Sequence, residues 1–387
     1  MNKKVMALAV AGALAAPAAA LAQVQIGGSL TILWYSHDPD NESQASSGDI
    51  LEPSEPELYI RASEKLGGGM TAWFQCASSL DGFIGGGNDA EGFCARNSGF
   101  GFRGSFGNVF LANWDTPSKL VQNRIRGWFS GTNALVGGSM RLIANSSSSG
   151  LPNPVPTAAT SASNSSFYRR QANSVNYHSP NWGGFSVAAA FSANNESTAI
   201  ADATGLTPRL LGINGVYASG PFWVGLAYEK HDDYNPGAVA GYTGGSDDNL
   251  TVGAGFRFGG FNIRAGFGDN NYEIGNGTGQ ELEATAIGIF ADWNIQGPHT
   301  IRAGFATLDD IEGNSTVPVG GYRPTGPATG ADWMSVAYSY AVSKRTEVSV
   351  AYNQMDNDTN STLTLGKEAV TTGGKQTSVG VVLKHRF

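Results

Sequence analysis

A chain of 387 residues is long enough for two or three soluble domains, but its composition favours another arrangement. It contains 53 glycines, only 14% of its residues are charged, and almost no segment has helical periodicity. These features favour many strands joined by turns and loops. The formal net charge of −8 argues against general nucleic-acid binding, so we expect no nucleic-acid partner.

The first 22 residues have the layout of a secretory signal peptide. Lys3 and Lys4 precede an apolar run over residues 5–16, and small residues follow it up to Ala22. We therefore expect export to the periplasm with cleavage of residues 1–22 after Ala22. Loss of the two lysines changes the net charge from −8 to −10. A membrane helix needs about 18 continuous apolar residues, and no stretch beyond the cleavage site is close to that length.

Sixteen segments of the mature chain alternate between apolar and polar residues and end at clusters of Gly, Pro, Asn and Asp, as strands do. Short turns, such as Ser219-Gly220 and Gly259-Gly260, alternate with links of about eight to fifty residues, which is typical of up-and-down membrane barrels. The predicted strands lie near residues 23–36, 56–66, 69–78, 94–104, 107–114, 167–179, 184–194, 208–218, 221–231, 248–258, 261–272, 282–294, 298–308, 331–342, 346–356 and 375–387.

The last segment indicates where these strands reside. Val379, Val381 and Leu383 fall on one face, and Lys384 and Arg386 fall on the other. A sheet that is apolar outside and polar inside spans a membrane only as a closed barrel, because closure leaves no unpaired edge in hydrocarbon. We therefore predict an all-β fold: a sixteen-stranded antiparallel transmembrane β-barrel over residues 23–387, wide enough for an aqueous lumen. A soluble secreted β-sandwich is the alternative fold.

The two cysteines, Cys76 and Cys94, are 18 residues apart in a chain routed through an oxidising compartment. A disulfide across one loop is expected there, and two unpaired thiols are the alternative.

Five motifs follow one another along the mature chain. They are Arg61-Ala62-Ser63-Glu64-Lys65-Leu66-Gly67-Gly68-Gly69-Met70 with Trp73-Phe74-Gln75 after it, residues 100–109 (Phe100-Gly101-Phe102-Arg103-Gly104 onward), residues 173–185 (Asn173-Ser174-Val175-Asn176-Tyr177-His178 onward), residues 343–348 (Ser343-Lys344-Arg345-Thr346 onward) and the terminal Val379 to Phe387. Together these motifs resemble those of the Gram-negative porins of β-proteobacteria. The resemblance implies a homotrimeric general porin of the cell outer membrane, in contact with outer-membrane lipid and lipopolysaccharide. It also implies that the third loop, residues 116–166, folds into the lumen and constricts it.

An acid-free stretch coincides with this loop. Between Asp115 and Glu196 the chain has no Asp or Glu, although it is acidic overall. Basic side chains in a narrow, low-dielectric constriction concentrate anions and repel cations, so we predict an anion-preferring pore. The alternative is a solvated rim that binds lipopolysaccharide phosphates or stabilises the loop. The basic residues of the stretch are Lys119, Arg124, Arg126, Arg141, Arg169 and Arg170.

Strand alternation adds wall residues to the predicted pore lining. Leu58 and Ile60 facing lipid turn Tyr59 and Arg61 inward. The same argument turns Arg170, Arg257 and Arg302 inward. Arg61 and Arg170 also match positions where the family tends to carry basic residues.

Two positions depart from simple expectation. Arg96 matches a family arginine and is counted as pore-lining, but alternation places it with Phe100 and Phe102 on the lipid side unless a bulge near Gly99 intervenes. Where the family often carries an arginine after the fifth strand, this chain has Asn113.

The leading functional prediction is passive diffusion of small anionic or neutral hydrophilic solutes and ions. A substrate-specific porin for an anionic solute, or a structural or adhesive barrel, is the alternative. Five scattered histidines offer no nucleophile–base arrangement or metal-ligand spacing, so neither catalysis, a cofactor nor a metal is expected. Calcium bound by Asp38, Asp40 and Glu42 is left open.

Overall fold

The computed structural model describes residues 23–39, 48–84, 92–130, 135, 137–146, 165–192, 206–234, 242–275, 277–365 and 370–387. The predicted signal peptide lies outside the described residues, as does part of the predicted constricting loop.

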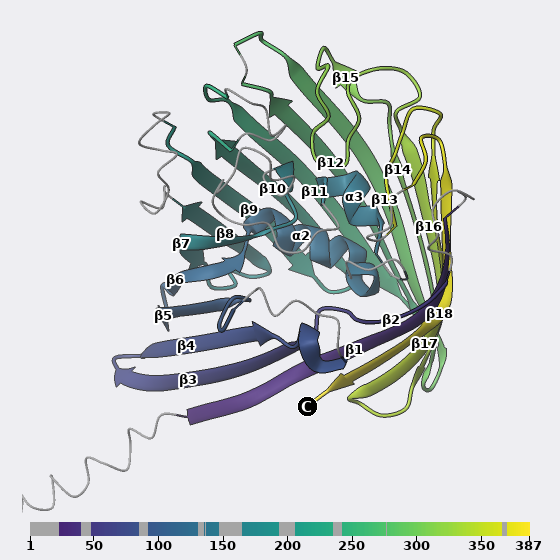
Figure 1. Ribbon diagram of the computed structural model, residues 1–387. Coiled ribbons are helices and arrows are strands. Elements are labelled where there is room, and N and C mark those ends of the chain that lie inside the picture. Colours follow the sequence, from purple (N-terminus) through teal and green to yellow (C-terminus); the bar gives the residue numbers. More distant parts are fainter. Residues whose placement is uncertain are drawn as a thin grey trace, which may run out of the picture.

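Sixteen long strands of the described chain form one antiparallel sheet, which closes into a barrel because the first strand pairs with the last (Figure 1). The pairing follows chain order, so every long strand is an antiparallel neighbour of the next. They are β1 (Gln23–Pro39), β3 (Glu57–Gly67), β4 (Met70–Ser79), β5 (Ser98–Gly104), β6 (Gly107–Asp115), β7 (Arg170–His178), β8 (Phe185–Ser192), β9 (Arg209–Ser219), β10 (Phe222–Asp232), β11 (Ser246–Phe258), β12 (Phe261–Glu273), β13 (Glu281–Gln296), β14 (His299–Leu308), β16 (Ala331–Ala341), β17 (Thr346–Asn357) and β18 (Lys375–Arg386).

Two short strands lie in segments that the sequence predicted only as links. β2 (Gly48–Pro53) pairs with Ile32–His37 of β1, while β3 pairs with Gln23–Ser29 of the same strand. β2 and β3 therefore share one position in the barrel. β15 (Glu312–Gly313) adds two residue pairs to the end of β13.

The strands separate an apolar outer face from a polar inner one. In β9 and β10, Leu211, Ile213 and Leu226 are about half exposed, whereas Asn214 and Ala227 on the other parity are buried. The exposed apolar parity suits lipid, and the buried parity faces an interior that loop segments partly fill.

Helices occupy part of that interior. α2 (Pro117–Arg126), η4 (Gly127–Ser130) and α3 (Ser139–Ala144) all belong to the link between β6 and β7, which the sequence predicted only as a loop. Figure 1 shows α2 and α3 inside the ring of strands. A further short helix, η2 (Asp81–Ile84), follows β4. No helix in the described residues is long and apolar enough to cross a membrane.

The predicted strand boundaries differ most at β5, which begins at Ser98 rather than at residue 94. Arg96 therefore precedes the strand, and the alternation that placed it on the lipid side does not reach it. Its side chain is 8% exposed, and its backbone N–H donates to the carbonyl oxygen of Ala77 at 2.9 Å. Gly99 pairs in regular register with Gln75 and Ala112, so no bulge at Gly99 determines the position of Arg96.

Candidate channel constriction

Helix α2 begins where the sequence supplies both an N-cap and a proline. Thr116 has an extended backbone, and its Oγ1 accepts a hydrogen bond from the N–H of Lys119 at 3.5 Å. Pro117 occupies the first turn, where a missing N–H costs nothing. The helix ends at Gly127, whose φ of +58° is a left-handed conformation that glycine adopts without strain.

α2 approaches the wall closely because β11 and β12 present glycines to it. A Cβ atom on Gly253 would lie 2.5 Å from Cγ1 of Ile125, and one on Gly266 would lie 2.6 Å from Cγ2 of the same side chain. Ile125 is completely buried between them and the rest of the core. These glycines therefore determine how far the helix stands from the wall, and thus how much of the lumen stays open.

A side-chain amide and a guanidinium of the wall bind the backbone of α2. Nδ2 of Asn214 donates to the carbonyl oxygen of Pro117 at 2.8 Å, at the start of the helix. Nε of Arg264 donates to the carbonyl oxygen of Ile125 at 2.9 Å, near its end. The second of these satisfies a carbonyl that the helix leaves without an internal partner.

α3 is fixed to the wall in a similar way. The hydroxyl of Tyr322 donates to the carbonyl oxygen of Leu142 at 2.6 Å, and Nδ2 of Asn270 donates to that of Ile143 at 3.1 Å. Nδ2 of Asn270 also lies 3.2 Å from the Tyr322 hydroxyl. One polar network thus joins α3, β12 and the link before β16.

A stack of three rings holds the segment that returns from the loop to β7. The ring of Phe167 stacks on His231 with centroids 4.6 Å apart, and His231 stacks on Tyr234 at 4.7 Å. Nε2 of His231 lies 3.0 Å from Oε1 of Glu229, and both side chains are fully buried. The loop is therefore anchored to β10 before the chain re-enters the wall.

Asp115, the last acid before the acid-free stretch, joins two of the predicted pore-lining cations. Its Oδ1 lies 2.8 Å from Nζ of Lys119 and 3.3 Å from Nε of Arg170, and its Oδ2 accepts a hydrogen bond from Asn97 at 2.9 Å. Both cations are almost fully buried, at 4% and 6% exposure. Burial lowers the pKa of Lys119, and the negative charge of Asp115 acts in the opposite direction. These residues form an ion-paired cluster at the N-terminal end of α2.

Arg61 differs from them because its side chain is exposed. Its Nε donates to Oε1 of Gln75 at 2.6 Å, and its guanidinium carbon lies 3.9 Å from the centroid of the Tyr59 ring. Gln75 in turn donates to the carbonyl oxygen of Asn97 at 2.6 Å. The guanidinium is thus oriented by a hydrogen bond and a cation–π contact while it stays accessible to solvent.

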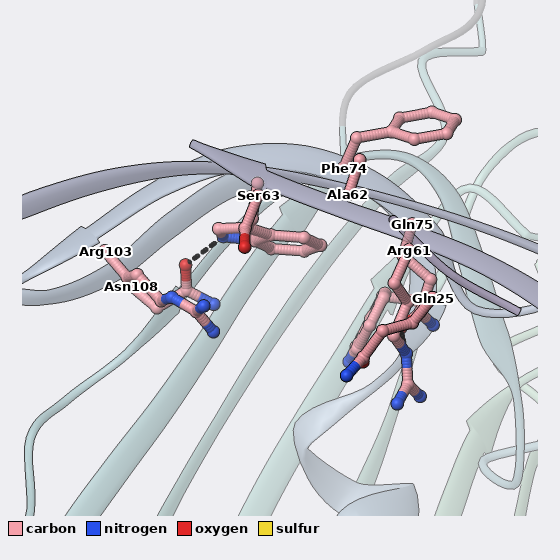
Figure 2. Close-up of a pocket in the computed structure, with 10 residues that line it drawn as sticks. Gln25, Arg61, Ala62, Ser63, Phe74, Gln75, Arg103 and Asn108 are labelled. Carbon is pink, nitrogen blue, oxygen red and sulfur yellow. Dashed lines mark hydrogen bonds between the residues drawn. The ribbon is translucent and has the colours of Figure 1, made fainter. Parts of the chain in front are cut away.

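Figure 2 shows how Arg61 lies relative to the wall. Arg61, Gln25 and Gln75 project from one side of the strands, and Phe74 projects from the other. Arg61 pairs in register with both glutamines, so all three share the inner face. They line a recess of about 420 Å³ whose lining also includes Ser63, Trp73, Arg103, Asn108 and Trp114.

The remaining loop cations divide by exposure. Arg124 is exposed, and its guanidinium lies 4.8 Å from the Trp223 ring centroid. Arg126 is buried and donates to the carbonyl oxygen of Phe129 at 3.2 Å. Arg141 is also buried, and burial lowers its pKa to about 10, so it is still a cation at neutral pH. Among the described loop cations of the prediction, Arg124 is the one that solvent reaches freely.

A row of charges on the inner wall joins Arg302, which alternation had already turned inward, to Arg264, Asp292 and Glu347, which the prediction did not name. Nη1 of Arg264 lies 2.5 Å from Oδ2 of Asp292, and Nη2 of Arg302 lies 3.0 Å from Oε2 of Glu347. Arg302 also lies 3.7 Å from Asp292. Strand alternation could have placed Arg264 on the inner face. Like Arg257, it stands between two apolar residues of a predicted strand.

Cys76 and Cys94 form a disulfide, with Cα atoms 4.7 Å apart. Asn113, at the position where the resemblance led us to expect arginine, donates to the carbonyl oxygen of Ala95 at 2.6 Å. Together these contacts hold the segment before β5 against its neighbours. This segment includes Asn97, which contacts both Gln75 and Asp115.

The described residues contain no group of three or more His, Cys, Asp or Glu side chains that could hold a metal ion. Two of the open calcium candidates, Asp40 and Glu42, lie outside the described part of the chain.

A closed barrel with an apolar outer face, a charged inner face and helices within its lumen is a membrane channel of the porin type. The sequence model of the Gram-negative porin family matches residues 7–360. The chain belongs to this family, and the predicted resemblance is confirmed.

Individual relatives agree with this assignment. Outer membrane porin protein 32 of Delftia acidovorans is 27% identical over 402 residues, which cover 100% of both chains. The solved structure of an anion-selective porin from Comamonas acidovorans superposes with a TM-score of 0.71 at 21% identity, covering 95% of this chain and 100% of that one. OmpT of Vibrio cholerae in its trimer form gives 0.63 at 12% identity, covering 95% and 99%. The protein is an outer-membrane channel, and its sixteen-stranded barrel is confirmed.

Proposed function

We propose that this channel lets small hydrophilic solutes and ions diffuse passively across the outer membrane and that it prefers anions. Arg61 carries the proposal, because it is exposed on the inner wall with its guanidinium oriented by Gln75 and Tyr59. A fixed cation in a narrow, low-dielectric lumen raises the local concentration of anions. Transport of this kind needs no catalytic step.

Other exposed arginines support the same preference. Arg103 lines the recess that contains Arg61, and Arg124 and Arg257 are exposed on α2 and β11. The wall acids Asp292 and Glu347 are engaged by Arg264 and Arg302, so their charges are largely compensated. The structural similarity to an anion-selective porin from Comamonas acidovorans supports this proposal.

The buried cations have a second role in the proposal. They are Arg170, Lys119, Arg126, Arg141 and Arg96. Their side chains are buried, so we assign them to the positive potential and to anchoring of the loop, not to direct contact with solutes. The loop over residues 116–166 is proposed as the constricting element.

We further propose that the mature protein begins after Ala22 and assembles as a homotrimer surrounded by lipid and lipopolysaccharide. A relative of the same fold has been solved in a trimer form, which supports this assembly. Solutes are expected to be small anions or neutral hydrophilic molecules.

The test compares Arg61→Ala with Arg170→Ala. Reversal potentials are measured in planar bilayers across a potassium chloride gradient, with the refolded mature protein. We expect the wild-type channel to favour chloride and Arg61→Ala to weaken that preference. Arg170→Ala should change it less, because the Arg170 side chain is buried, whereas that of Arg61 is exposed to the permeating ions.

Other outcomes would redirect the proposal. A wild-type channel that favours potassium would keep the porin and remove the anion preference. Block of the current by one anionic solute at low concentration, without block by other anions of its size, would favour a substrate-specific porin. Folded protein that forms no channels would favour the structural or adhesive barrel.

A further inference from the structure

A second recess lies at the end of the barrel where the short turns are. Its lining comes from the end of α2, from the turn between β9 and β10, and from the adjoining ends of β11 and β12. Its volume is about 240 Å³. The lining residues that carry the argument are Arg124, Gly127, Trp223, Arg257, Asn262 and Arg264.

Positive charge dominates this recess. Arg124 and Arg257 are both exposed, and they are close enough to interact: burial lowers the pKa of Arg124, and the like charge of Arg257 lowers it further. Arg264 contributes a third guanidinium, which is paired with Asp292. Among the described residues at the recess, three cations therefore face one carboxylate, which leaves two positive charges uncompensated.

Arg264 is held in place with one donor group left without a partner among the described residues. Its Nε is bound to the carbonyl oxygen of Ile125 and its Nη1 to Asp292, so the plane of the guanidinium is fixed. Nη2 is buried and has no hydrogen-bond partner in the described part of the chain. The Arg264 side chain is only 5% exposed, and leaving such a donor unsatisfied is unfavourable.

The other two arginines also keep donors available. Nε of Arg257 reaches Oδ1 of Asn262 only at 3.4 Å, a long hydrogen bond. Arg124 lies over the face of Trp223, a contact that orients the guanidinium without using its N–H groups.

Gly127 lets the guanidinium of Arg264 lie directly against the end of α2. A Cβ atom there would lie 2.9 Å from Cζ and 3.0 Å from Nη2 of Arg264. A side chain at this position would thus crowd the unsatisfied donor itself.

We propose that this recess is a binding site for a small dianionic oxyanion of the phosphate or sulfate type, held by Arg124, Arg257 and Arg264. Arginine forks suit the oxygens of such anions, and a charge of −2 balances the excess at the recess. The inference rests on the proposed anion channel and gives it a defined subsite on the turn side of α2. An anion that leaves the constriction would pause there before release.

The test measures block of the potassium chloride current by inorganic phosphate or sulfate, added to either chamber of a planar bilayer. We expect block that saturates with concentration and differs between the two chambers, because the recess lies on one side of α2. Arg257→Gln should raise the half-blocking concentration about tenfold, the effect of losing about one charge-assisted hydrogen bond. Arg257→Lys should give an intermediate value, since it keeps the charge and loses the fork.

Lys344→Gln is the matched control. Lys344 is an exposed cation in the turn between β16 and β17, at the same end of the barrel and outside the recess, so its loss should leave the block within twofold of wild type. Equal effects of Arg257→Gln and Lys344→Gln, or the absence of block in all variants, would overturn the subsite. Chloride preference in the wild type is read from the same bilayers, so failure of the subsite is distinguished from failure of the anion channel.

Discussion

Asp115 links the burial of two cations to the charge near the loop. Among the described residues it is the carboxylate that ion-pairs with both Lys119 and Arg170, and Asn97 fixes its second oxygen. Its cluster carries a net charge of +1, because two cations share one anion. The carboxylate therefore limits the positive charge near the loop while it makes the burial of two cations tolerable.

We predict that Asp115→Asn strengthens anion preference and weakens the fold. The cluster would change from +1 to +2, and two nearly buried cations would lose their counterion. Breaking a buried ion pair from one side costs about 3 to 5 kcal/mol. Reversal potential gives the first effect, and the midpoint of thermal unfolding in detergent gives the second.

Lys119→Met in the Asp115→Asn background is the control. Removal of one stranded cation should recover part of the lost stability, as a double-mutant cycle would reveal. If Asp115→Asn unfolds at the wild-type temperature, the ion pairs contribute nothing to anchoring α2.

At the scale of elements, the contact between α2 and the wall depends on two positions of β11 and β12 that have no side chain. Glycines at 253 and 266 let Ile125 lie where side chains would otherwise stand. Gly225 on β10 is different, because a Cβ atom there would meet its nearest neighbours at an ordinary 3.4 Å. The three positions therefore form a matched comparison.

We predict that Gly266→Ala displaces α2 and alters single-channel conductance, whereas Gly225→Ala does not. The added methyl group would overlap Ile125, which is fully buried and has little room to move. Overpacking of this kind costs about 1 to 3 kcal/mol. Single-channel recording and thermal unfolding of both variants provide the measurement.

Ile125→Ala should rescue Gly266→Ala, because it removes the overlapping atoms. If the double variant keeps the conductance of Gly266→Ala, the overlap with Ile125 is not the cause. The substitution would then have changed the wall and not the position of α2.

At the scale of the whole molecule, charge is segregated. The chain has a formal net charge of −8, yet the inner wall and α2 carry exposed arginines. Net charge is therefore a poor guide to the selectivity of this channel, because permeating ions respond to the potential inside the lumen.

We predict that anion preference falls as salt concentration rises. The screening length shortens from about 10 Å at 0.1 M to about 3 Å at 1 M, so exposed cations such as Arg61 and Arg124 influence a smaller part of the lumen. The ratio of chloride to potassium permeability, measured across gradients of equal ratio at the two concentrations, should move toward one.

Diffusion of a neutral sugar into liposomes is the control, because screening does not act on an uncharged solute. A permeability ratio that is constant from 0.1 to 1 M would mean that pore width and not lining charge selects the ions.

Some of the site could be predicted from sequence and some could not. Alternation correctly marked the face of Arg61, because strand geometry is local: neighbours along the chain point to opposite sides of the sheet. It could not be applied to Arg96, which precedes β5, and it gave no information on the loop. The ring stack around His231 joins residues far apart in sequence, and no local pattern announces it.

The sequence by itself determined the sixteen strands, the alternation of short and long connections, and the family, because these depend on local periodicity and on motifs in order. Tertiary structure alone decided which cations are exposed. One helix, α2, carries Lys119, Arg124 and Arg126, and of these three only Arg124 is exposed. Lys119 is buried in an ion pair with Asp115, and Arg126 is buried where it donates to the carbonyl oxygen of Phe129. Burial depends on contacts between distant segments, and a pattern along the chain does not contain them.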